Sequence, residues 1–93
     1  MRRIKLTVAY DGTDYCGWQI QPNGITIEEV LNSALSRLTG QRVTVIGASR
    51  TDAGVHARGN VAVLDTESPI PPERFAHAVN PLLPEDIVVV KSE

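Results

Sequence analysis

The chain has 93 residues, of which 42% are hydrophobic and 22% charged, so it is long enough for one modest domain with a single core. A formal net charge of -2 excludes a polycation that holds nucleic acid by charge alone, although a local basic patch is still possible. The single cysteine excludes an intrachain disulfide and a cysteine-based zinc site. No apolar run is long enough to span a membrane and no signal peptide is visible, so we expect a cytoplasmic protein.

The first half of the chain predicts a strand followed by a helix. Residues 4–10 alternate between apolar and polar or small side chains, which is typical of a half-buried strand. After an irregular stretch, Thr26 and Glu29 have the spacing of a helix capping box. Apolar residues then recur at three- and four-residue steps over residues 27–38, and Gly40 is placed to end the helix.

The second half predicts three more strands and a second helix. Two strands are expected near Arg42–Ile46 and Asn60–Asp65. Pro71 or Pro72 suits the first position of a second helix, which Asn80-Pro81 would stop. The continuous apolar run Ile87–Val90 is typical of a strand in a central position.

This order of elements, β-α-β-β-α-β, predicts an α+β protein with a ferredoxin-like fold. Such a fold has an antiparallel four-stranded sheet with two helices on one face, and its other face is open. We expect a partner or a second domain to cover the open face. Because the same fold is found in enzymes, RNA-binding modules and metal carriers, it does not determine the function.

The passage Ala48–Asn60, ASRTDAGVHARGN, is predicted to be a loop that is unusually long for a connection between two strands. Taken one by one, its Asp and Gly residues only shape a turn and its arginines are solvated. Taken together they are more informative, because long loops on small scaffolds are often functional. Arg50, Asp52 and His56 lie among small or apolar neighbours that would partly desolvate the carboxylate. A desolvated carboxylate beside a cation is a usual arrangement for a nucleophile or a base.

Three stretches of this sequence resemble the TruA-type tRNA pseudouridine synthases. Residues 49–57, SRTDAGVHA, closely resemble the signature of that family. Residues 10–19, YDGTDYCGWQ, are similar to its second motif, and residues 26–31, TIEEVL, to a weaker third one. The family more often has Gln at the position of Asn60 and Gly at that of Ser49. Family members are longer and pair two half-domains around a cleft, so we expect residues 1–93 to be the N-terminal half-domain, without the C-terminal half.

The resemblance implies an isomerase that converts uridine to pseudouridine in the anticodon stem-loop of tRNA, at tRNA positions 38 to 40. The N1–C1′ bond is cut, the base rotates, and it is rejoined through C5, with no metal and no cofactor. The implied partners are tRNA and the C-terminal half of the same enzyme, with no membrane. From the uncovered sheet face we also expect a homodimer. In the family, downstream residues supply a tyrosine that stacks on the uracil and a basic residue that pairs with the aspartate. We therefore expect the 93 residues alone to be inactive.

The resemblance also implies roles for single residues. Asp52 matches the catalytic aspartate, which either attacks C1′ or removes the C2′ proton. Arg50 matches the arginine that fills the space of the flipped base and contacts the phosphate backbone. Thr51, His56 and Arg58 are further candidates for contact with RNA, although Thr51 and His56 also fit a bracing role. The residues expected to shape or support the loop are Gly54, Tyr10, Asp11 and Trp18.

Three other functions are weighed against this interpretation. An RRM-like RNA-binding module would stack bases on aromatic residues of its sheet, but the predicted central strands 43–46 and 61–64 contain none. An interaction module would use the open face only for assembly, and Asp52 would then be dispensable. A carboxylate-dependent glycosidase generally needs a pair of acids, and only Asp52 lies in the predicted loop.

Overall fold

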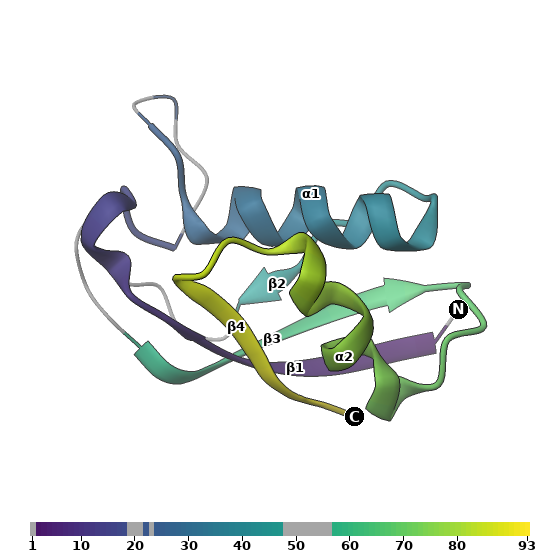
Figure 1. The fold of residues 1–93 in the computed structure, drawn as a ribbon. Coiled ribbons are helices and arrows are strands. Elements are labelled where there is room, and N and C mark those ends of the chain that lie inside the picture. The colour runs from purple at the N-terminus through teal and green to yellow at the C-terminus, as the bar shows by residue number, and fades with distance from the viewer. Residues whose placement is uncertain (1, 19–21, 23, 48–56) are drawn as a thin grey trace.

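The computed structural model describes residues 2–18, 22, 24–47 and 57–93. Figure 1 shows helix α1 lying over the sheet and helix α2 close to strand β4. No helix within these residues is long and apolar enough to cross a membrane. The elements are β1 (Arg2–Tyr10), α1 (Ile27–Thr39), β2 (Ile46–Gly47), β3 (Ala57–Thr66), α2 (Phe75–Val79) and β4 (Ile87–Ser92), with short 3-10 turns at Gly12–Asp14, Pro72–Arg74 and Asn80–Leu82.

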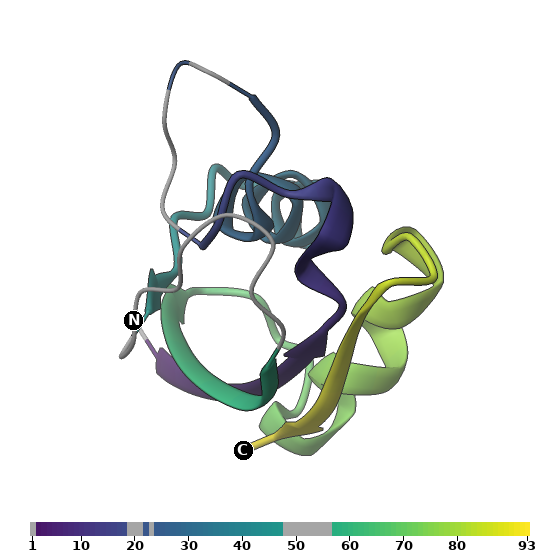
Figure 2. The ribbon, with the colours of Figure 1, turned by 90° about the vertical axis from the view of Figure 1, so that its left-hand side faces the viewer.

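The four strands form one antiparallel sheet in the order β2-β3-β1-β4. This order confirms the predicted ferredoxin-like α+β fold. The even-numbered side chains of β1, from Ile4 to Tyr10, are buried and share one core with residues of both helices. The odd-numbered side chains of β1 face the other way. Figure 2 looks along the sheet from the end where β1 stops and β3 begins, with α1 above the strands.

Helix α1 has the predicted beginning and end. The Thr26 hydroxyl accepts a hydrogen bond from the Glu29 N–H at 3.3 Å, which satisfies one of the free donors of the first turn. Gly40 follows the last turn with φ of 71°, a left-handed conformation that costs glycine little. The face turned to the sheet is fully buried and comprises Ile27, Leu31, Ala34 and Leu35.

The prediction for the second strand was wrong in extent. A strand was expected over Arg42–Ile46, whereas β2 contains only Ile46 and Gly47. The Val43 N–H donates instead to Ser36 Oγ at 2.9 Å, and the Val45 N–H to Asn32 Oδ1 at 2.8 Å. Both acceptors belong to α1. The alternation of burial in this stretch therefore comes from packing against a helix, and the helix side chains take over the hydrogen bonds of a neighbouring strand.

The prediction of a central position for the Ile87–Val90 strand was also wrong, because β4 lies at an edge of the sheet. Val88 and Val90 are 40% and 55% exposed. The outer edge of β4 is partly covered by the Asn80 side chain, which donates to the Val89 carbonyl at 3.0 Å and accepts from the Val89 N–H at 2.8 Å. An amide group that pairs with a strand edge in this way protects it from pairing with another chain.

Two further boundaries differ from the sequence prediction. Strand β3 begins at Ala57, three residues before the predicted start at Asn60, so residues 57–59, which were assigned to the loop alone, belong to a strand. The second helix is not one continuous helix, since a single α-helical turn, α2, lies between two 3-10 turns. Pro81 lies inside the second of these turns, and its ring has no N–H to continue an α-helix.

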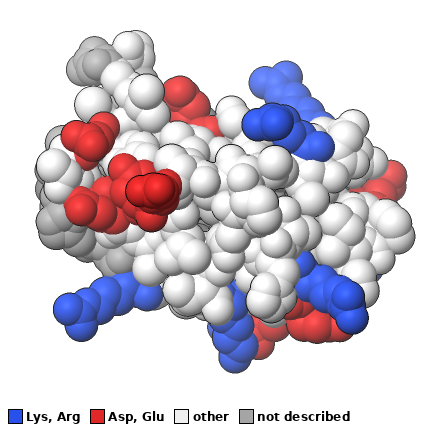
Figure 3. Space-filling model, viewed as in Figure 1, with Lys and Arg blue, Asp and Glu red and all other residues white. Residues whose placement is uncertain are grey.

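The face of the sheet that carries the odd-numbered residues of β1 is open and mixed in character. Its apolar members include Ala9, Ile46, Val61, Val63 and Val88, and the strand register places Ile46 beside Val63 and Ala9 beside Val88. Its charged members include Arg3 and Asp65, which form an exposed ion pair at 2.8 Å. Figure 3 shows basic and acidic side chains together along the lower margin, and a further group of acidic ones on the left, towards the end of β1.

Candidate active site

The structure describes the surroundings of the RTDAGVH motif but not the motif itself. Of the predicted site residues, Tyr10, Asp11, Trp18 and Arg58 are described. The residues next to the motif are described too, with Gly47 as the last residue of β2 and Ala57 as the first of β3. The predicted site residues that lie outside the described part of the chain are Arg50, Thr51, Asp52, Gly54 and His56.

Tyr10, the last residue of β1, lies beside the first residue of β3. It pairs with Ala57 in the sheet, and its side chain is only 5% exposed. Its hydroxyl accepts a hydrogen bond from Asn60 Nδ2 at 3.3 Å, and Asn60 is itself buried. The second motif thus contacts the strand that follows the first motif.

Trp18 lies against Gly47, the described residue that precedes the RTDAGVH motif. A Cβ atom at position 47 would come closer to three atoms of the Trp18 indole than real Cβ atoms come to any neighbour. The indole also packs on the Tyr10 ring, with ring centres 6.0 Å apart and planes at 36°. The Trp18 carbonyl accepts from the Glu28 N–H at 3.0 Å, in the first turn of α1. Trp18 therefore joins β1, β2 and the start of α1.

Asp11 serves the local backbone. Its carboxylate accepts hydrogen bonds from the Thr13 N–H at 3.0 Å and the Thr13 hydroxyl at 2.5 Å, which caps the 3-10 turn that follows. The Asp11 N–H donates to the Asp86 carbonyl at 2.9 Å, which ties the turn to the start of β4. These contacts give Asp11 a structural role close to the end of β1.

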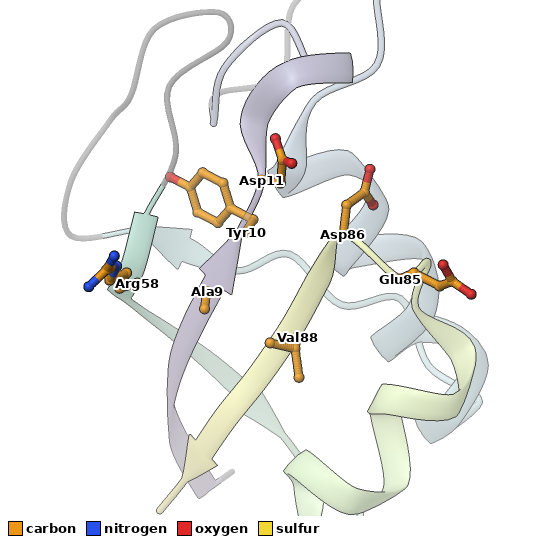
Figure 4. A pocket seen from close by; sticks show the side chains of 7 residues that line it. All are labelled: Ala9, Tyr10, Asp11, Arg58, Glu85, Asp86 and Val88. Atoms are coloured by element: carbon orange, nitrogen blue, oxygen red, sulfur yellow. The ribbon is translucent and has the colours of Figure 1, made fainter.

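Arg58 lies in an irregular part of β3. Tyr10 pairs with Ala57 and Val8 with Asn60, so Arg58 and Gly59 together lie opposite Ala9. Such a β-bulge redirects side chains and is common next to active sites. Arg58 lines an open pocket of about 420 Å³ at this end of the sheet (Figure 4). The other residues that line it are Ala9, Tyr10, Asp11, Glu85, Asp86 and Val88.

The charges of this pocket are mostly acidic. One guanidinium, from Arg58, and the carboxylates of Asp11, Glu85 and Asp86 line the pocket, with Arg58 on the opposite side of β1 from Glu85 and Asp86 (Figure 4). The Asp86 carboxylate is held by the hydroxyl of buried Tyr15, which donates to it at 2.6 Å. Burial raises the pKa of Tyr15 well above its usual value, and the bond to Asp86 raises it further. The phenol is therefore a neutral hydrogen-bond donor at physiological pH. Because carboxylates outnumber the one guanidinium, the pocket by itself does not attract a polyanion such as RNA.

No group of three or more His, Cys, Asp or Glu side chains that could hold a metal ion occurs among the residues that the structure describes. The acidic side chains of the pocket do not form such a group.

Comparison with known proteins identifies the family. The family model described as tRNA pseudouridine synthase matches residues 6–93. The chain belongs to the tRNA pseudouridine synthase family. The relative from Ruminiclostridium cellulolyticum, named tRNA pseudouridine synthase A, is 57% identical over all 93 residues, and that from Acetivibrio thermocellus, of the same name, is 52% identical over the same length. A third relative of this name, from Geotalea daltonii, is 53% identical over 89 residues.

The chain spans only part of the length of these tRNA pseudouridine synthases. It covers 38% of the first two relatives and 36% of the third, while 100%, 100% and 96% of the chain itself is matched. The match to the tRNA pseudouridine synthase family thus includes all the residues around the motif that the structure describes.

Two residues that were not identified from the sequence, Asn60 and Gly47, contact Tyr10 and Trp18 of the second motif. Asn60 was noted only as a departure from the family pattern, and its partner Tyr10 is 50 residues away. Gly47 gave no signal, because it was assigned to neither the strand nor the loop. Asn60 did carry a signal, since a polar side chain at an inward position of a predicted strand needs a hydrogen-bond partner.

Proposed function

We propose that this chain is part of an enzyme that isomerises uridine to pseudouridine in tRNA, with Asp52 as its catalytic carboxylate. The observation that carries the proposal is the match of residues 6–93 to the tRNA pseudouridine synthase family. It is supported by relatives named tRNA pseudouridine synthase A at 52% and 57% identity over the whole chain. We further propose the anticodon stem-loop, at tRNA positions 38 to 40, as the substrate region.

The chemistry needs one well-placed carboxylate. Breaking the N1–C1′ bond develops positive charge on the ribose, which a carboxylate stabilises or traps. The base then turns, C5 bonds to C1′, the hydrogen of C5 leaves as a proton, and N1 takes up a proton. A base in a stem must first leave the stack, and Arg50 is proposed to fill the vacated space with its flat guanidinium. Thr51, His56 and Arg58 are proposed to contact the RNA.

The rest of the enzyme is part of the proposal. We propose that a C-terminal half supplies a tyrosine that stacks on the uracil and a basic partner for Asp52, and that the enzyme works as a homodimer. The net charge of -2 and the acidic pocket beside Arg58 support this division, because they give the 93 residues little electrostatic attraction for tRNA.

An RRM-like binding module fits the structure less well. Such a module stacks bases on aromatic side chains of its open sheet face. Within the described central strands β1 and β3, the one aromatic residue is Tyr10, which is buried on the helix side.

A tritium-release assay tests the proposal. Full-length protein containing this sequence is incubated with tRNA labelled with tritium at uracil C5, and formation of pseudouridine releases the label to water. We expect the wild type to release it and Asp52→Asn to fall by at least about 10³-fold while tRNA affinity stays within about threefold, as for loss of a residue that acts mainly in the transition state. Activity of Asp52→Asn within tenfold of wild type would remove Asp52 from the catalytic role.

A further inference from the structure

Four residues form a continuous line of contacts between the two ends of segment 48–56. Asn60 donates to the Tyr10 hydroxyl, the Tyr10 ring packs on Trp18, and the Trp18 indole lies against Gly47. The three side chains are 8%, 5% and 1% exposed, respectively. We call these four residues the Tyr10 cluster. Gly47 immediately precedes the segment, and Tyr10 pairs with Ala57, which immediately follows it.

We infer that the Tyr10 cluster is a positioning device for the reaction, and this inference rests on the proposed function. Asp52 lies five residues along the chain from Gly47 and five from Ala57, so both ends of its segment are attached to one buried cluster. A catalytic group has to be held within about 0.5 Å of its productive position. Misplacement by about 1 Å can slow a reaction by about 10²-fold. The members of the cluster are positioning residues and need not touch the substrate.

The hydrogen bond between Asn60 and Tyr10 is the directional part of the cluster. It runs diagonally across the bulge at Arg58 and Gly59, from the residue paired with Val8 to the residue paired with Ala57. Apolar packing alone would leave the bulge free to shift, because such packing has no direction. A hydrogen bond between two buried polar groups is costly to break, since water does not replace it.

The test compares single-turnover rates and tRNA affinities in full-length protein. We expect Tyr10→Phe, which keeps the ring but loses the hydroxyl, and Asn60→Leu to slow pseudouridine formation by about 10-fold or more, while the Kd for tRNA changes by less than about threefold. Asn60→Gln keeps the amide donor and is expected to recover most of the rate. Asn80→Ala is the matched control. It removes an amide with two hydrogen bonds to β4, outside the Tyr10 cluster, and should leave the rate unchanged.

Hydrogen exchange on the same proteins tests whether the Tyr10 cluster holds the two ends of segment 48–56, independently of the reaction rate. In Tyr10→Phe and Asn60→Leu, we expect faster exchange in peptides that cover Ile46–Gly47 and Ala57–Asn60, and no such change in Asn80→Ala. Unchanged exchange would show that the Tyr10 cluster does not hold the two ends of segment 48–56, whatever the activity. Faster exchange with an unchanged rate would overturn the positioning role. If the wild type makes no pseudouridine, the proposed function fails and the positioning role falls with it, while the exchange data still decide whether the cluster holds the two ends.

Discussion

At the scale of single residues, the buried Tyr15 hydroxyl is a pH-sensitive contact. It donates to Asp86 at 2.6 Å, and burial together with this bond raises the pKa of Tyr15 in the folded protein. A tyrosine with a raised pKa binds its proton more tightly in the folded than in the unfolded state. Its contribution to stability is therefore fully present below the unfolded pKa of about 10 and is lost as the pH rises further.

We expect Tyr15→Phe to lower the free energy of unfolding at pH 8 by about 1.5 to 3 kcal/mol, the usual contribution of a hydrogen bond to a charged group. This difference from wild type should shrink between pH 8 and pH 11, because only the wild type has Tyr15 to ionise on unfolding. Urea denaturation of both proteins at the two pH values measures it. A difference that stays constant would show that the phenol does not have the raised pKa.

At the candidate site, the sequence pattern predicted some of the residues but not the contacts between them. The sequence singled out Tyr10, Asp11 and Trp18 because they lie in a second family motif. The structure places Tyr10 and Trp18 beside the ends of segment 48–56, and it ties Asp11 to the start of β4. The pattern did not show their partners. Asn60 and Gly47 are distant from Tyr10 and Trp18 along the chain, and such contacts depend on strand register, which no local pattern specifies.

At the scale of elements, the start of α1 depends on one buried hydroxyl. Thr26 is fully buried, and its side chain caps the Glu29 N–H. We expect Thr26→Ala to lower the free energy of unfolding by about 1 kcal/mol, and Thr26→Ser to recover most of this loss because the hydroxyl remains. Ser33→Ala, at an exposed position of the same helix, is the control and should stay within about 0.5 kcal/mol. Thermal or urea unfolding measures all three, and equal effects of Thr26→Ala and Ser33→Ala would contradict the capping role.

The elements also show which sequence signals carry structural information. The capped helix was predicted almost to the residue because its signals are local: a capping box, a 3.6-residue period and a terminal glycine. The extent of β2 was not predicted correctly. An alternating pattern shows which side chains face the core, but it does not show which groups the backbone N–H and C=O bond to. The place of β4 in the sheet was missed for a related reason. An apolar run predicts burial on both faces, but Val88 and Val90 of this edge strand are partly exposed.

At the scale of the whole molecule, the two faces of the sheet differ. The helix side holds the core, whereas the open side combines apolar residues with exposed charges. The Arg3–Asp65 pair belongs to the open side. The hydrogen bond from Arg3 lowers the pKa of Asp65, but both side chains are exposed and the pair contributes little to stability. Exposed apolar side chains lie at both edges of this face, Ile46 in β2 and Val88 in β4.

We expect the 93-residue chain to associate reversibly with itself through the open face. Ile46, at the β2 edge, is 59% exposed there and Val88, at the β4 edge, 40%, and exposed apolar side chains favour association. A net charge of -2 opposes association only weakly. Sedimentation equilibrium should show weaker association for Ile46→Lys than for wild type. Ile25→Lys is the matched control, since Ile25 is equally exposed, at 57%, but precedes α1 and lies outside the sheet. A chain that stays monomeric at high concentration, or equal effects of the two lysines, would show that the open face is not the associating surface.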